Sequence, residues 1–167
     1  GLIPENELSR GAGVALNPVT SGPLVDESLE TSVPGVFACG NVLHVHDLVD
    51  YVSQEAAAAG RSAAKFLQEG EARSESPITL KAINGVRYTV PATVDPARMA
   101  EETIVRFRVA DVFRNVTVVV TCDGETLLRK KRMIVAAGEM VDIKLKRADL
   151  LARPGAKEIT VALEVAK

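Results

Sequence analysis

The stretch from residue 31 to residue 70 constrains the fold more than any other part of the chain. It contains a turn, a short apolar run, a glycine and then a long segment rich in small residues. The apolar run is 36–39, bounded by Pro34-Gly35 before it and by Gly40-Asn41 after it, which predicts a buried strand. Gly40 has no side chain and tolerates a positive φ, so a ligand can approach the backbone there. A strand that leads through glycine towards a helix favours an anion site, because free N–H groups converge at a helix N-terminus.

The following segment is predicted to be a helix from about residue 48 to residue 69. Asp47 is a plausible N-cap, and Gly70 is a typical residue to follow the last turn. Apolar residues recur at helical spacing on one face: Leu48, Val52, Ala56, Ala59, Ala63 and Phe66 or Leu67. The small residues in the middle of this face allow close packing against a sheet, which explains them without any cofactor.

Residues 31–41 resemble the second flavin-binding segment of the FAD-dependent pyridine nucleotide-disulfide oxidoreductases, the family that includes thioredoxin reductase. The family signature is Thr-x-x-Pro-Gly-x-Phe-Ala-x-Gly-Asp. This chain matches it from Thr31 to Gly40 and has Asn41 in place of the usual Asp. The turn at 1–6 is similar to a Gly-x-x-Pro-Asn-like turn of the same family, so the resemblance covers roughly residues 1–70.

The resemblance implies that the chain takes part in binding FAD. Asn41, after Gly40, would hold the ribityl or pyrophosphate region, and its amide can both donate and accept a hydrogen bond. The backbone around Gln54 and Glu55 would face the flavin ring. The parent enzyme would also use NAD(P)H and pass a hydride between nicotinamide and flavin. The resemblance assigns no catalytic residue.

Part of the family pattern is missing. The Gly-x-Gly-x-x-Gly fingerprint that cradles the pyrophosphate does not occur in the sequence, and no Cys-x-x-Cys pair is present. We therefore expect the chain to be a C-terminal fragment of a longer flavoenzyme, inactive alone, with a preceding FAD- and NAD(P)H-binding portion as its partner. An incomplete sheet exposes strand edges, so association with a second copy is also possible.

The loop His44-Val45-His46-Asp47 admits several interpretations. Alternate histidines with a nearby carboxylate are a possible metal site, but the sequence offers no obvious fourth ligand, and we predict no metal. His44, His46 and Asp47 are instead candidates for the flavin side of the site, or they are structural. Cys39 and Cys122 both lie in apolar runs and are predicted to be buried free thiols, which is consistent with the cytoplasm.

The charge distribution indicates two units. Residues 1–76 carry 4 basic and 11 acidic groups, a net charge of −7, whereas residues 77–167 carry 16 basic and 11 acidic groups, a net charge of +5. A positive module can bind an anionic partner, but attraction between the two halves is the simpler explanation. The sequence contains no apolar run of membrane-spanning length, so we predict no membrane partner.

Residues 71–77 read as a linker, and the pattern beyond them changes to period two. Asn84-Gly85 predicts a hairpin, and Asp123-Gly124 and Ala137-Gly138 predict turns. Seven strands are expected, at 78–82, 86–90, 103–109, 116–121, 126–134, 140–145 and 157–165. Such a series over residues 78–167 favours an antiparallel β-sandwich of immunoglobulin or fibronectin type III character.

Residues 129–132 are a run of four basic residues on a predicted strand. Because alternation puts half of the charges on each face and no aromatic residue is near, we interpret the run as a protected edge strand, not a nucleic-acid site. The sequence therefore predicts an α+β protein, with a partial FAD-binding α/β segment followed by the β-sandwich. The alternative function is a non-catalytic β-sandwich interaction module with a structural N-terminal remnant.

Overall fold

The computed structural model describes residues 3–70 and 74–165, and the chain divides into two compact units, Gly1–Glu75 and Ser76–Lys167. The predicted turn at 1–6 and the predicted linker 71–77 lie partly outside the described residues. Within the described ranges, no helix is long and apolar enough to cross a membrane.

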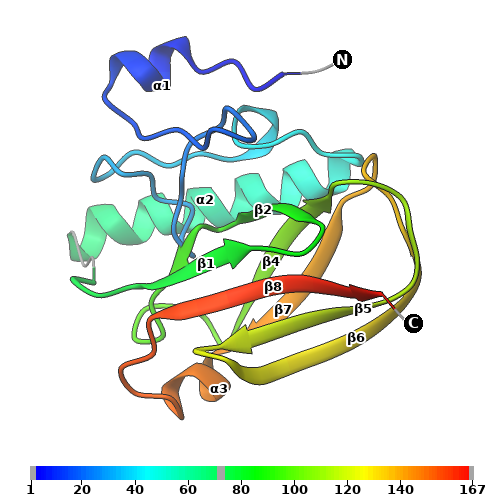
Figure 1. Cartoon of the computed structure of the whole chain (residues 1–167). Coiled ribbons are helices and arrows are strands. Elements are labelled where there is room, and N and C mark those ends of the chain that lie inside the picture. Colours follow the sequence, from blue (N-terminus) through cyan, green and yellow to red (C-terminus); the bar gives the residue numbers. More distant parts are fainter. Residues whose placement is uncertain (1–2, 71–73, 166–167) are drawn as a thin grey trace. The chain divides into compact units, whose positions relative to one another are not determined.

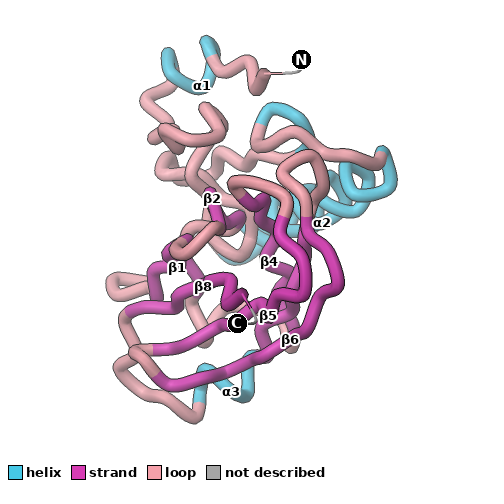
Figure 2. The backbone as a smooth tube through the Cα atoms, turned by 45° about the vertical axis from the view of Figure 1, so that its right-hand side comes forward, coloured by secondary structure: helices cyan, strands magenta, loops and turns pink. Residues whose placement is uncertain are grey.

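The first unit consists of helices and loops, whereas the long strands belong to the second unit (Figure 2). The helices of the first unit are α1 (Glu7–Gly11), the 3-10 turn η1 (Gly40–Val42) and α2 (Val49–Glu69). The predicted strand at 36–39 is wrong: Phe37 makes only an isolated bridge with Glu30. A run of apolar residues forms a strand only where a neighbouring segment provides a continuous ladder of backbone hydrogen bonds. The described residues around 36–39 provide only single bridges.

The predicted turn at Pro34-Gly35 does form. The Val36 N–H donates to the carbonyl of Val33 at 3.1 Å, and Gly35 has a φ of 75°. This combination is that of a type II turn, in which glycine is favoured at the third position. The Thr31 N–H then donates to the carbonyl of Val36 at 2.8 Å, so the motif is a short hairpin.

Helix α2 spans nearly the predicted residues, but its N-cap differs from the prediction and part of its predicted buried face is exposed. Leu48, with extended backbone, occupies the N-cap position and provides no side-chain cap; the predicted N-cap, Asp47, is exposed. Gly70 follows the last turn with a φ of 79°, as expected. The predicted face is wrong at Leu48 and Ala56, which are exposed. Ala59 is buried as predicted, and Val52, Ala63 and Phe66 are half-buried. The other buried residue of the helix is Glu55, whose burial was not predicted.

Helix α2 packs along the 31–41 motif, and glycines permit the close approach. A Cβ atom at Gly35 would lie 3.1 Å from the Phe66 ring, and one at Gly40 would lie 3.2 Å from Cγ1 of Val52. Phe37 meets Phe66 edge to face, with ring centroids 6.1 Å apart. The motif glycines are therefore required by the packing of this helix.

The second unit is mostly β-sheet. It has a five-stranded sheet in the order β3-β1-β8-β5-β6 and a three-stranded sheet in the order β2-β4-β7 (Figure 1). Its elements are β1 (Ile78–Ala82), β2 (Val86–Val90), β3 (Thr93–Val94), β4 (Glu102–Val109), β5 (Phe113–Cys122), β6 (Glu125–Val135), β7 (Val141–Lys146), α3 (Arg147–Leu151) and β8 (Glu158–Val165). All seven predicted strands are present near their expected positions; β3 and α3 were not predicted. The chain as a whole is of mixed α+β class.

Two details of the predicted sandwich are wrong. Strands β1 and β8 pair in parallel, so the five-stranded sheet is not purely antiparallel. The Asn84-Gly85 turn forms with φ values of 48° and 90°, but β1 and β2 belong to different sheets and do not make a hairpin. A turn dipeptide fixes the local reversal, whereas the partners of each strand depend on the core.

The predicted edge strand is confirmed, because β6 ends the five-stranded sheet. Lys130 and Arg132 lie opposite Val118 and Val116 of β5. They therefore lie on the face of the sheet that packs into the hydrophobic core at other positions. Charged residues pointing inward at a sheet edge oppose pairing with another chain.

One hydrophobic core joins the two sheets of this unit. Its fully buried side chains include Phe107, Val105 and Val109 from β4, Ile143 from β7, and Ile159 and Val161 from β8. The alternation of β4 is as predicted, with the valines and the phenylalanine inward.

We expect Phe107→Ala to lower the free energy of unfolding by about 3–5 kcal/mol, because it leaves a large cavity in this core. Ile104→Ala, on the other face of the same strand where the side chain is 37% exposed, should cost less than about 1 kcal/mol. Urea unfolding of both variants measures the difference. Equal losses would contradict the assignment of the two faces.

Candidate functional site

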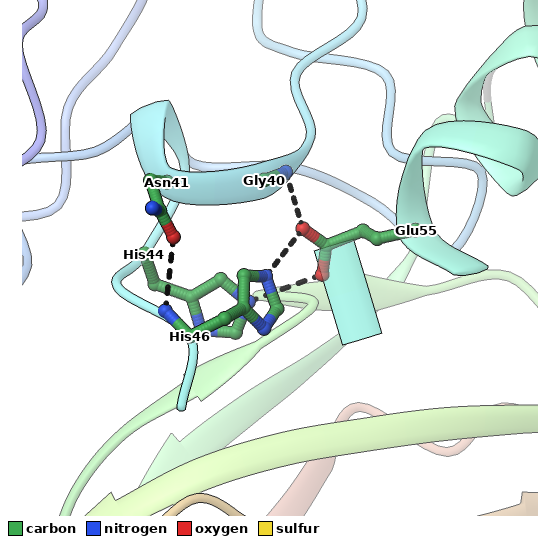
Figure 3. Close-up of polar contacts among 5 residues, drawn as sticks. All are labelled: Gly40, Asn41, His44, His46 and Glu55. Atoms are coloured by element: carbon green, nitrogen blue, oxygen red, sulfur yellow. Dashed lines mark hydrogen bonds and ion pairs between the residues drawn. The ribbon is translucent and has the colours of Figure 1, made fainter. Parts of the chain in front are cut away.

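A cluster of buried polar side chains lies between η1 and α2. Glu55 projects from α2, and His44 and His46 project from the loop that precedes this helix (Figure 3). Their exposed fractions are 2% for Glu55, 1% for His44 and 8% for His46. Ionisable groups are seldom buried to this extent unless they are paired.

The Glu55 carboxylate is the centre of the cluster. Its Oε1 lies 3.1 Å from Nε2 of His44, and its Oε2 lies 2.9 Å from Nε2 of His46. The Gly40 N–H also donates to Oε2, at 2.6 Å. One carboxylate therefore joins the end of the motif and both histidines to helix α2.

The loop geometry brings the two imidazoles to the same side. The side-chain oxygen of Asn41 accepts a hydrogen bond from the backbone N–H of His46 at 3.1 Å. The ring centroids of His44 and His46 are 4.4 Å apart and their planes are inclined by 67°, so both Nε2 atoms reach the same carboxylate (Figure 3).

A buried amide side chain, that of Asn6, fixes the position of η1. Asn6, which is 4% exposed, donates from Nδ2 to the carbonyl oxygens of Val42 at 2.8 Å and Ser21 at 3.1 Å. Leu43 is fully buried, and Gly22 lies so close to its backbone that a Cβ atom there would be 1.7 Å from the Leu43 carbonyl oxygen. The loop that carries the histidines is thus held at its start by side-chain hydrogen bonds and tight backbone packing.

The charge of Glu55 depends on its neighbours. Burial by itself would raise the pKa of its carboxyl group, but hydrogen bonds from His44 and His46 and their positive charge lower the pKa from 4.5 to about 2. Glu55 is therefore ionised at neutral pH.

The predicted site residues fall into two groups. His44, His46 and Glu55 are buried together, and Gly40 contacts them through its N–H. Asn41, Asp47 and Gln54 are exposed. The N–H of Gly40, which is held at a φ of 69°, is already donated to Glu55.

The sequence predicts only a backbone role for Glu55 and groups the histidines with Asp47. In the structure the carboxylate that joins the histidines is that of Glu55, and the ligand atoms of the three residues lie within 4.8 Å of one another. A signal was present: Glu55 is three residues after Val52 and four before Ala59, which places it on the predicted apolar face. An acidic residue on such a face indicates a buried partner.

The two cysteines are free. Cys39 is only half-buried and Cys122 is buried. Burial raises the pKa of both thiols, and the charge of Glu55 raises that of Cys39 further. Both effects reduce the thiolate population, which is unfavourable for a nucleophilic or redox role.

Comparisons with known proteins identify no relative of this chain. No family model matches the chain, and neither the curated proteins nor the solved structures contain a match to it.

We expect Glu55→Gln to lower the free energy of unfolding by about 3 kcal/mol at pH 7, measured with a chelator present, because it breaks a buried ionic cluster. The pKa of Glu55 is lower in the folded chain than its ordinary value of 4.5. Its charge therefore stabilises the fold above about pH 4.5, and this contribution disappears as the pH falls towards about 2.

Denaturant unfolding between pH 7 and pH 2 measures this prediction. Glu69→Gln is the matched control, because Glu69 is on the same helix and its side chain is 59% exposed. A difference between wild type and Glu55→Gln that stays constant down to pH 2 would contradict the assigned charge state.

Proposed function

We propose that this chain is the C-terminal segment of an FAD-dependent, NAD(P)H-linked oxidoreductase and supplies part of the flavin site. The observation that carries the proposal is the start of α2, which follows the flavin-like motif 31–41 after the intervening residues 42–48. Leu48 at the N-cap has no side-chain oxygen and makes no capping hydrogen bond. The Tyr51 N–H donates to the Leu48 carbonyl at 3.1 Å, and for the N–H groups of Val49 and Asp50 that precede it a flavin carbonyl is a suitable acceptor.

The residues around this helix start support the same interpretation. Val42, Leu48 and Val49 are exposed by 37%, 54% and 74%, although all three are apolar. Apolar side chains gathered near a helix start suggest a surface that something covers. A flavin ring and the preceding portion of the enzyme are the covering groups that the proposal requires.

Asn41 is the polar side chain best placed to select the ligand. It is exposed, and its Oδ1 already accepts from the His46 N–H, so its Nδ2 can donate to the ribityl chain or a phosphate. Asp50 in the first turn of α2 adds negative charge, which favours a neutral carbonyl over a phosphate at the helix itself.

In this proposal the flavin supplies the redox chemistry, with a hydride passing between nicotinamide and the ring. The chain's own residues orient the cofactor. The buried cluster of His44, His46 and Glu55 does not contact the cofactor in this proposal. It fixes the position of the loop on which Asn41 lies. The preceding portion of the parent supplies the pyrophosphate fingerprint and the NAD(P)H site.

The second unit is then an appended module of immunoglobulin or fibronectin type III character. Two sheets around one core support this, whereas the parallel pairing of β1 with β8 departs from it. The alternative function, a non-catalytic interaction module, is favoured by one observation. Strand β6 is a long edge strand on which Met133 is 84% exposed and Ile134 is 47% exposed. Exposed apolar side chains of this kind can contact the surface of a partner, although the inward charges of Lys130 and Arg132 oppose strand addition.

The test is the flavin content of the complete product of the gene, including any coding sequence before residue 1. We expect about one FAD per chain, seen as flavin absorbance. Asn41→Ala should weaken FAD binding about tenfold, the equivalent of one hydrogen bond. Asn41→Asp, which restores the usual residue of the family, should retain binding.

Lys130→Ala, on the edge strand of the second unit, is the control and should leave the flavin affinity unchanged. A folded, complete gene product that stays colourless after FAD is added would refute the oxidoreductase function. It would leave the interaction module as the function to pursue.

A further inference from the structure

We propose that His44, His46 and Glu55 bind one divalent transition-metal ion, for which Zn²⁺ is the reference ion. This site is independent of the flavin proposal and differs from the metal-free expectation of the sequence. Two imidazoles and one carboxylate are ligands typical of Zn²⁺ and other first-row divalent ions. Mg²⁺ and Ca²⁺ prefer oxygen ligands and are disfavoured by this set.

The distances fit one small ion. With bonds of about 2.0–2.1 Å, ligand atoms around tetrahedral zinc lie roughly 3.3–3.4 Å apart. The two Nε2 atoms lie 3.1 Å and 2.9 Å from the oxygens of Glu55. The ligand atoms of all three residues lie within 4.8 Å of one another, so only small side-chain shifts are needed to enclose an ion (Figure 3).

The surroundings hold these ligands in place. The Gly40 N–H donates to Oε2 of Glu55 and orients the carboxylate. Asn41 fixes the backbone at His46 through the hydrogen bond from its N–H. Outer contacts of this kind orient metal ligands and raise metal affinity. Glu55 comes from the 21-residue helix α2, whose backbone hydrogen bonds fix the position of its Cα atom.

The protonation states are compatible with metal binding. In the structure both Nε2 atoms face carboxylate oxygens and act as N–H donors. An ion takes the place of these protons, and each imidazole then carries its proton on Nδ1. Nδ1 of His46 is buried and has no hydrogen-bond partner in the part of the chain that the structure describes, so no donor directed at Nδ1 opposes a proton on that atom.

The burial of the cluster indicates a structural site. The side chains of the three residues are at most 1% exposed, which leaves no room for substrate. With two neutral imidazoles, one carboxylate and one divalent ion, the site as a whole has a net charge of +1. A water molecule would be the fourth ligand. The ion would join the 40–46 loop to α2 more firmly than hydrogen bonds do.

The experiment uses the whole 167-residue chain, stripped with a chelator and without flavin, so that its outcome does not depend on FAD binding. Zn²⁺ is titrated by calorimetry, and the thermal midpoint is recorded with and without the ion. We expect one Zn²⁺ per chain and a higher midpoint. A folded wild-type chain that binds no Zn²⁺ would overturn the proposal.

The ligands are assigned by variants. Glu55→Gln and His46→Gln should each weaken Zn²⁺ binding at least ~100-fold, more than the loss of a group outside the ligand set costs. Asp47→Asn is the matched control, since Asp47 is the neighbouring carboxylate and is exposed, and it should bind within about threefold of wild type. Equal losses in Asp47→Asn and Glu55→Gln would overturn the assigned ligand set.

A spectroscopic measurement on the wild type does not depend on whether the variants fold. The chain has two histidines in total, so its imidazole nitrogen NMR signals report only on His44 and His46. Addition of one equivalent of Zn²⁺ should shift both Nε2 signals. Unshifted Nε2 signals in a chain that has bound Zn²⁺ would place the ion elsewhere and overturn the proposal.

Discussion

The first unit depends on the burial of one negative charge. A carboxylate that is 2% exposed is tolerated only if its surroundings replace the lost water. At Glu55 this is done by the N–H of Gly40 and by the imidazoles of His44 and His46. These contacts come from different points of the 40–46 loop, so Glu55 joins the loop to α2. Asn6 and the close packing of Gly22 hold the start of the same loop. The exposed side of the same loop is then free to present Asn41 to a ligand.

The 31–41 motif gains a structural explanation that does not require a cofactor. Gly35 and Gly40 both have positive φ, and both lie against side chains of α2, Phe66 and Val52. This packing by itself accounts for the glycines, so they do not support flavin binding. The flavin proposal depends instead on Asn41 and on the helix start, which has no side-chain cap. The proposed flavin contact of Asn41 and the buried cluster would thus lie on two sides of one loop.

The second unit combines a predictable core with less predictable connections. Alternation along β4 places Phe107 in the core and Ile104 outside it, as the sequence indicates. The partners of β1 and β2 were predicted wrongly, because Asn84-Gly85 is a hairpin signal and yet its turn links two sheets. Inward-facing Lys130 and Arg132 lie on β6 at the sheet edge, where their charges reach water and oppose association.

The sequence by itself determined features that follow from local patterns: a turn at Pro34-Gly35, the end of α2 at Gly70, the strand periods and the edge character of β6. Only the tertiary structure decided which strands pair, that 36–39 lacks a ladder, and that Glu55 joins the histidines where Asp47 was expected. Pairing and burial depend on groups distant in the chain, as Glu55 and Gly40 are, and one sequence does not specify their contact. The physical reason is that a buried charge is placed by its partners, and these meet only when the helix packs against the loop.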